Sequence, residues 1–264
     1  EAVSGKYYYN VYQTDPIDTD IEEVQFAVAY GHVDGSGSVT LDVDPNGLLP
    51  TKATYAQYKS ILLDPTDTKF SFENGSGVAE DSNSIYAINV NRARFREKMD
   101  AGNWSIQLSG SNGEFTFIDD SGKKFSDTVG KAGRVFNIAS GSLNLGSQAE
   151  ATVASTTASN GEGYGLFYPD MGIILLNPKA LAAAVDPKLG EASGSHSNTY
   201  HQNNGNKSGS VALLMAISGG MDFQVRRTEN VSTSHYFVRA NNREFNFSNN
   251  PTFVSGSVGQ FAQS

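Results

Sequence analysis

The chain has 264 residues, of which 38% are hydrophobic and 18% charged, with a formal net charge of −9. That length supports one large or two modest domains, and 15 Phe with 12 Tyr give far more to bury than a disordered chain has. The acidic balance argues against nucleic-acid wrapping, which needs a basic surface, and no apolar run reaches the about 18 residues of a membrane span. The absence of cysteine excludes disulfides and thiol chemistry.

The first 20 residues are aromatic and then acidic, without a helix start signal. We expect an extended N-terminal arm or an edge strand that packs on a neighbouring subunit. The candidate contact residues of this arm are Tyr7, Tyr8 and Tyr9. After the arm, VQFAVAY at 24–30 predicts a strand, and the alternating segment 39–44 is expected to pair with it across a glycine-rich turn.

The strongest helix signal covers residues 51–63, where apolar residues recur at helical spacing and Asp64-Pro65 ends the run. Period-two patterns then predict strands at 68–73, 84–90, 104–110, 114–119 and 133–146. A Ser-Asn-Gly turn joins the strands at 104–110 and 114–119, so these two are expected to form a hairpin.

Residues 91–100 predict a short basic helix or a wide loop. Arg92, Arg94 and Arg96 could bind nucleic acid, with Phe95 interleaved as a stacking group. The overall acidic charge opposes that interpretation. A subunit interface with an acidic partner, such as the Asp-rich arm of a neighbouring copy, is the favoured alternative.

Residues 147–163 are rich in small polar residues and predict a linker or long loop. MGIILLN at 171–177 predicts a buried strand, and Pro178 opens a short helix. A polar loop at 190–209 and a helix at 210–218 follow. The stretch 221–253 alternates apolar and polar residues, which predicts a final β meander.

That last stretch also carries arginines in an otherwise acidic chain. A guanidinium gives forked hydrogen bonds to carboxylates and carbonyls, so arginines on strands favour subunit pairing over catalysis. The candidate interface arginines are Arg226, Arg227, Arg239 and Arg243.

These elements indicate an α+β, β-dominated fold of antiparallel sheets with a few short helices. We expect an N-terminal arm at 1–20, a β-rich subdomain at 21–146, a linker at 147–163, and a second β-rich subdomain at 164–264.

Potential metal sites are weak. His196 and His201 could ligate a metal, but they lie in a Gly/Ser/Asn-rich loop where solvated side chains are the better interpretation. Asp42 and Asp44 faintly resemble a calcium loop without its regular spacing or closing Glu, so a turn explains them more simply.

Catalytic arrangements are equally weak. Asp119 and Asp120 are adjacent, so on a strand they would face opposite sides and could not act as an acid pair; a hairpin turn is the ordinary interpretation. His235 is interpreted as a buried strand histidine. No nucleophile or phosphate-loop motif is present, so we expect neither enzymatic activity nor a cofactor.

Four segments resemble virion structural proteins of contractile-tailed phages, especially those infecting marine bacteria. They are TKATYAQYKSILLDPTDTKFSF (51–72), IYAINVNRARFREKMDAGNWSIQLSG (85–110), GYGLFYPDMGIILLNPKAL (163–181) and HYFVRANNREFNFSNNPTF (235–253). The resemblance implies a tail or baseplate component, assembled in the host cytoplasm, that docks to copies of itself and to other virion proteins. It also implies that the polypeptide continues beyond Ser264 into a further β-rich region.

The alternative function is a receptor- or carbohydrate-binding module of a tail fibre or spike. Exposed Tyr residues would supply stacking platforms, and the many Asn side chains would supply hydrogen bonds. Trp104 is the only tryptophan, and it follows a Gly-Asn turn in a predicted strand, where a core position is the better interpretation.

Overall fold

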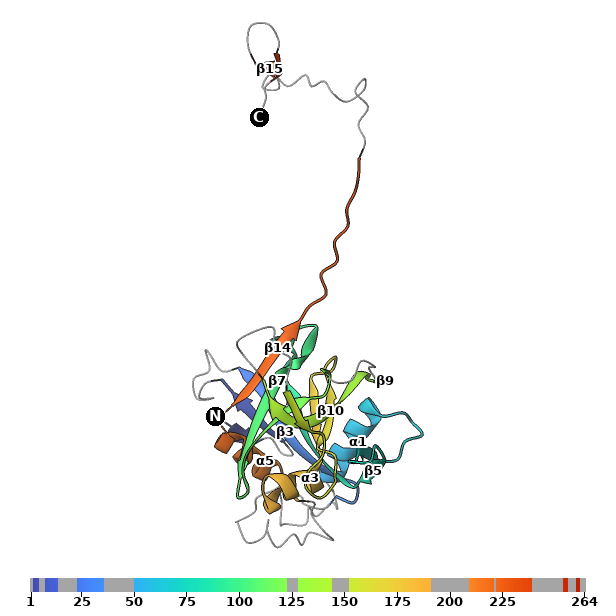
Figure 1. Cartoon of the computed structure of the whole chain (residues 1–264), viewed down its shortest axis with the longest axis vertical. Coiled ribbons are helices and arrows are strands. Elements are labelled where there is room, and N and C mark those ends of the chain that lie inside the picture. Colours follow the sequence, from blue (N-terminus) through green and yellow to red (C-terminus); the bar gives the residue numbers. More distant parts are fainter. Residues whose placement is uncertain are drawn as a thin grey trace. The chain divides into compact units, whose positions relative to one another are not determined.

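The computed structural model describes residues 2–4, 8–13, 23–35, 50–122, 128–143, 152–190, 209–220, 222–238, 254–255 and 260–261. The chain divides into two compact units, residues 1–229 and 230–264. The fold is β-dominated, with a curled antiparallel sheet and a few helices, which confirms the predicted fold class (Figure 1).

The helices are α1 (Pro50–Leu62), α2 (Arg92–Phe95), α3 (Pro178–Ala184), the 3-10 helix η1 (Pro187–Leu189) and α5 (Gly209–Gly220). The strands of the first half are β1 (Ala2–Ser4), β2 (Tyr8–Tyr12), β3 (Val24–His32), β4 (Phe70–Glu73), β5 (Ala79–Ser82), β6 (Ser84–Val90), β7 (Lys98–Gly110) and β8 (Gly113–Asp119). Those of the second half are β9 (Thr128–Gly130), β10 (Gly133–Ser142), β11 (Thr152–Ser155), β12 (Gly165–Tyr168), β13 (Ile173–Leu176), β14 (Phe223–Thr228), β15 (Val254–Ser255) and β16 (Gln260–Phe261).

One large sheet carries the order β1-β2-β3-β6-β13-β12-β10-β8-β7-β14, and β9 and β11 also pair with β10. Small sheets β4-β5 and β15-β16 are separate from it. β13 pairs with β6, and β12 pairs with β10, all antiparallel. Strands from before and after residues 147–163 therefore belong to the same sheet.

Elements with clear periodicity form where the sequence predicts them. The strand expected at 84–90 is β6, the hairpin is β7-β8 with Gly110 paired to Gly113, and the helix expected at 51–63 is α1. The first residues provide the edge strand β1, which pairs with β2, and β2 in turn pairs with β3. The strand expected at 39–44 lies outside the described residues.

Alternation along the central strands separates two hydrophobic cores. Tyr86, Ile88 and Val90 of β6 enter the larger core, which also takes side chains from α3 and α5. Ile85 and Ala87 face the other way, into a smaller core with residues of α1 and β4. Figure 1 shows α1 beside β5, and α3 and α5 in another part of the same unit.

Helix α3 begins where the sequence supplies both a cap and a proline. The side-chain oxygen of Asn177 accepts a hydrogen bond from the backbone N–H of Lys179 at 3.1 Å, and Pro178 occupies the first helical position. The Asn177 amide donates to the carbonyl of Gly163 at 3.0 Å. This side chain therefore fixes the start of α3 against the loop before β12.

Helix α1 lies directly against β3 at Gly31. A Cβ added there would lie 2.9 Å from the backbone nitrogen of Tyr55 and 3.0 Å from its Cα. The Tyr55 hydroxyl donates to the carbonyl of Ser82 at 2.8 Å and accepts from the N–H of Phe70 at 2.9 Å. These two hydrogen bonds therefore hold α1 at the point where it packs closely against Gly31.

We expect Gly31→Ala to lower the free energy of unfolding by about 1–3 kcal/mol, because the methyl group meets helix backbone instead of a flexible side chain. Urea denaturation measures the change. The matched control is Gly130→Ala, whose Cβ would meet only a Val135 methyl at 3.7 Å and should shift stability by less than about 0.5 kcal/mol. Equal stability of the two variants would contradict the close packing of α1.

Candidate functional site

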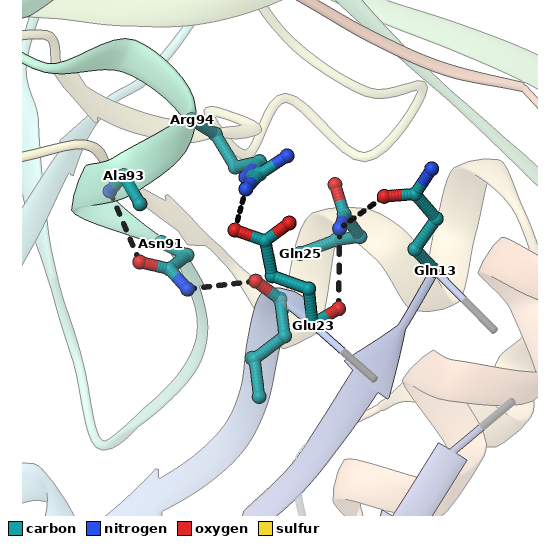
Figure 2. Close-up of polar contacts among 7 residues, drawn as sticks. Gln13, Glu23, Gln25, Asn91, Ala93 and Arg94 are labelled. Atoms are coloured by element: carbon teal, nitrogen blue, oxygen red, sulfur yellow. Dashed lines mark hydrogen bonds and ion pairs between the residues drawn. The ribbon is translucent and has the colours of Figure 1, made fainter. Parts of the chain in front are cut away.

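A cluster of polar contacts ties α2 to the start of β3 (Figure 2). The guanidinium of Arg94 forms an ion pair with the carboxylate of Glu23. Asn91 caps α2 by accepting from the N–H of Ala93 at 3.1 Å, and its amide donates to the carbonyl of Val24 at 2.7 Å. These contacts therefore hold α2 against β3, and the charge of Arg94 is paired with a carboxylate of its own chain.

The neighbouring arginines also contact their own chain. Arg92 donates to the carbonyl of Asp170 at 2.8 Å, and its guanidinium carbon lies 5.0 Å from the centre of the Phe95 ring. Arg96 lies 3.6 Å from the Glu229 carboxylate, at the end of β14. Both the nucleic-acid and the acidic-partner interpretations require these guanidinium groups, and in the structure the groups contact residues of their own chain.

Strand β14 lies at one edge of the large sheet, paired on one side with β7. Arg226 and Arg227 are both exposed on it. Arg227 lies 3.3 Å from the carboxylate of Glu229, so this single acid contacts both Arg96 and Arg227. Exposed ion pairs contribute up to about 1 kcal/mol each, so these two contacts add modest stability at the end of β14.

The residues that follow Glu229 are all exposed as far as residue 238. Residues 230–238, which we term the exposed segment, have no regular secondary structure. Its apolar side chains are 87–98% exposed; they are Val231, Tyr236, Phe237 and Val238. Exposed single apolar residues are common, but three consecutive large ones with this exposure indicate a contact surface.

The exposed segment corrects the expectation of a continuous β meander from residue 221. β14 confirms its first strand, but residues 229–238 form no strand, and His235 is exposed. The prediction of a buried strand histidine was therefore wrong. Alternation shows that a backbone can be extended, but it does not supply the neighbouring strand that would pair with it.

The other predicted contact residues are only partly described. Tyr8 is 46% exposed and Tyr9 is half-buried, both on β2 near the opposite edge of the sheet. Tyr7, Arg239 and Arg243 lie outside the described residues, as do His196, His201, Asp42 and Asp44. Within the residues that the structure describes, no three His, Asp or Glu side chains gather as a metal site would require.

Asp119 and Asp120 are buried and accept hydrogen bonds from different residues. Asp119 accepts hydrogen bonds from the backbone N–H groups of Gly102 at 2.7 Å and Ser121 at 2.9 Å. Asp120 accepts from the backbone and side-chain nitrogens of Asn137 at 2.9 and 3.2 Å. Each carboxylate thus accepts these hydrogen bonds from its own set of residues, and the two sets have no donor in common.

Replacing Asp119 with Ala is expected to destabilise the protein by about 1–3 kcal/mol, because two backbone N–H groups lose their acceptor. Thermal unfolding followed by circular dichroism provides the measurement. Glu114→Ala on the same strand is the control, since Glu114 is exposed and its carboxylate accepts one hydrogen bond, from the Gln107 amide, within the described part of the chain. A melting temperature for Asp119→Ala as high as that of this control would contradict the assignment.

Trp104 is fully buried and packs against Phe167, with the ring centres 4.9 Å apart. Its predicted core position is confirmed, so this side chain offers no platform for a sugar. No helix in the described part of the chain combines the length and apolar character that crossing a membrane requires.

Together these features define a β-dominated protein whose described surface bears an edge strand, an arginine–glutamate anchor and an exposed apolar segment. Comparisons with protein-family models, curated proteins and solved structures found no match.

Proposed function

We propose that this protein is a structural component of a phage tail or baseplate, and that it acts by docking to copies of itself and to other virion proteins. The observation that carries the proposal is the exposed segment with Tyr236, Phe237 and Val238 uncovered. Burying a large apolar side chain contributes about 1.5–3 kcal/mol, so these three residues together give a strong drive for association. The resemblance of segments along the chain to phage tail proteins supports a tail or baseplate as the particle to which the protein belongs.

The anchor at Glu229 suits a docking segment. Arg96 and Arg227 contact the side chain of Glu229, the residue immediately before the exposed segment, and these ion pairs restrain the end of β14. Edge strand β14 leads directly into the segment, and a free strand edge is a common site for adding a strand from another chain. Arg226 makes no ion pair with any described residue and is the arginine best placed to contact such a partner.

The proposal requires the chain to be a stoichiometric part of tailed particles. Mass spectrometry of purified virions from a phage that encodes the chain should detect it at a copy number comparable to known tail proteins. Size-exclusion chromatography with light scattering of the isolated chain should show self-association. A chain that is absent from particles and monomeric at all concentrations would overturn the proposal.

A further inference from the structure

A pocket of about 320 Å³ lies between α1 and the face of strands β2, β3 and β6. Ala27 and Ala29 of β3 form its floor. Its polar lining comes from three elements: Tyr8 of β2, Asn89 of β6, and Thr54, Gln57 and Tyr58 of α1. The volume falls within the range of sites that hold small molecules.

Sheet register explains why this pocket is present. Tyr8 pairs with Ala29, and Ala27 pairs with Asn89, so the two small alanine side chains lie on the same face as Tyr8 and Asn89. Gly31 follows two residues later and lets α1 pack closely at Tyr55. Because the alanine side chains are small, the space beside that contact remains unfilled.

Three polar side chains of the pocket are neutral and available. Among the described residues, the side chains of Gln57, Tyr58 and Asn89 find no hydrogen-bond partner, and no charged side chain lines the pocket. Burial raises the pKa of Tyr58 to about 12, so its hydroxyl remains protonated at neutral pH. The lining therefore offers hydroxyl and amide donors and acceptors, with no charge to bind a phosphate, a carboxylate or a metal ion.

We propose that this pocket binds a neutral saccharide unit. A sugar ring has an apolar C–H face that stacks on an aromatic ring, and hydroxyl groups at its edge that pair with amides and phenols. The Tyr8 and Tyr58 rings supply the first kind of contact, while Gln57 and Asn89 supply the second. This site lies in a different part of the chain from the exposed segment and is independent of the docking proposal.

Saturation-transfer NMR of the full chain with maltotriose, cellotriose and chitotriose tests the proposal. At least one of these neutral trisaccharides should bind. Ala53→Met should weaken that binding at least about tenfold, because Ala53 lines the pocket and a longer side chain there occupies it. Ala56→Met is the matched control, since Ala56 is exposed on the same helix and does not line the pocket.

A second variant tests the polar contact separately from the space. Asn89→Leu keeps a side chain of similar size at an exposed position but removes both hydrogen-bonding groups, and it should also weaken binding about tenfold. Circular dichroism verifies that each variant is folded. Failure of all three trisaccharides to bind the wild-type chain, or unchanged binding by Ala53→Met, would overturn the proposal.

Discussion

Under the docking proposal, changing Tyr236, Phe237 and Val238 together to Ser is expected to reduce the yield of assembled particles at least about 100-fold. Burial of each side chain contributes about 1.5–3 kcal/mol, and about 1.4 kcal/mol corresponds to a factor of ten in affinity. The three side chains are 87–98% exposed, so the isolated chain should keep its melting temperature. Complementation of a phage that lacks the chain provides the measurement.

The control for this experiment lies in the same segment. Ser232, Thr233 and Ser234 are exposed and polar. Changing all three to Ala removes their hydroxyl groups and leaves the length of the segment unchanged. Particles should form with this control as with the wild type. Normal assembly with the Tyr236, Phe237 and Val238 variant would show that the exposed segment is not a docking surface.

Trp104→Ala is expected to lower the free energy of unfolding by about 3–5 kcal/mol, the range for removing a large aromatic side chain from a packed core. Trp104 lies on β7, packs on Phe167 of β12 and is fully buried. The loss would therefore open a cavity in the larger core, inside the curled sheet. Urea denaturation of the full chain measures it.

Trp104→Phe is the informative comparison. Among the residues that the structure describes, the indole nitrogen has no hydrogen-bond partner, so phenylalanine gives up volume but no polar contact there. Its cost should be well below that of alanine, because much of the aromatic packing on Phe167 remains. Equal loss in the two variants would mean that a contact of the indole nitrogen, and not packing, holds Trp104 in place.

Local patterns predicted local elements well. β6 and the β7-β8 hairpin follow from period-two alternation, and α3 follows from the start signal of Pro178. These signals depend on neighbouring residues, which the sequence displays directly. The order of strands depends on pairing between distant segments, so nothing in the local pattern placed β13 between β6 and β12.

The same dependence on pairing between distant segments explains why the pocket and the contact of Arg96 with Glu229 were not predicted. The pocket depends on Ala27 lying beside Asn89 and on α1 crossing β3 at Gly31, and both are consequences of distant pairing. Arg227 was predicted as an interface residue, yet only the structure brings Arg96 to the same Glu229. A pair of alanines two apart in β3, where larger residues are usual, was the one signal of the pocket in the sequence.

The most direct test of the docking proposal is a cryo-EM map of intact particles from a phage that encodes this chain. The proposal predicts that Tyr236, Phe237 and Val238 are buried against a neighbouring tail or baseplate subunit. A map in which these side chains remain in solvent, or in which the chain has no place in the particle, would contradict it.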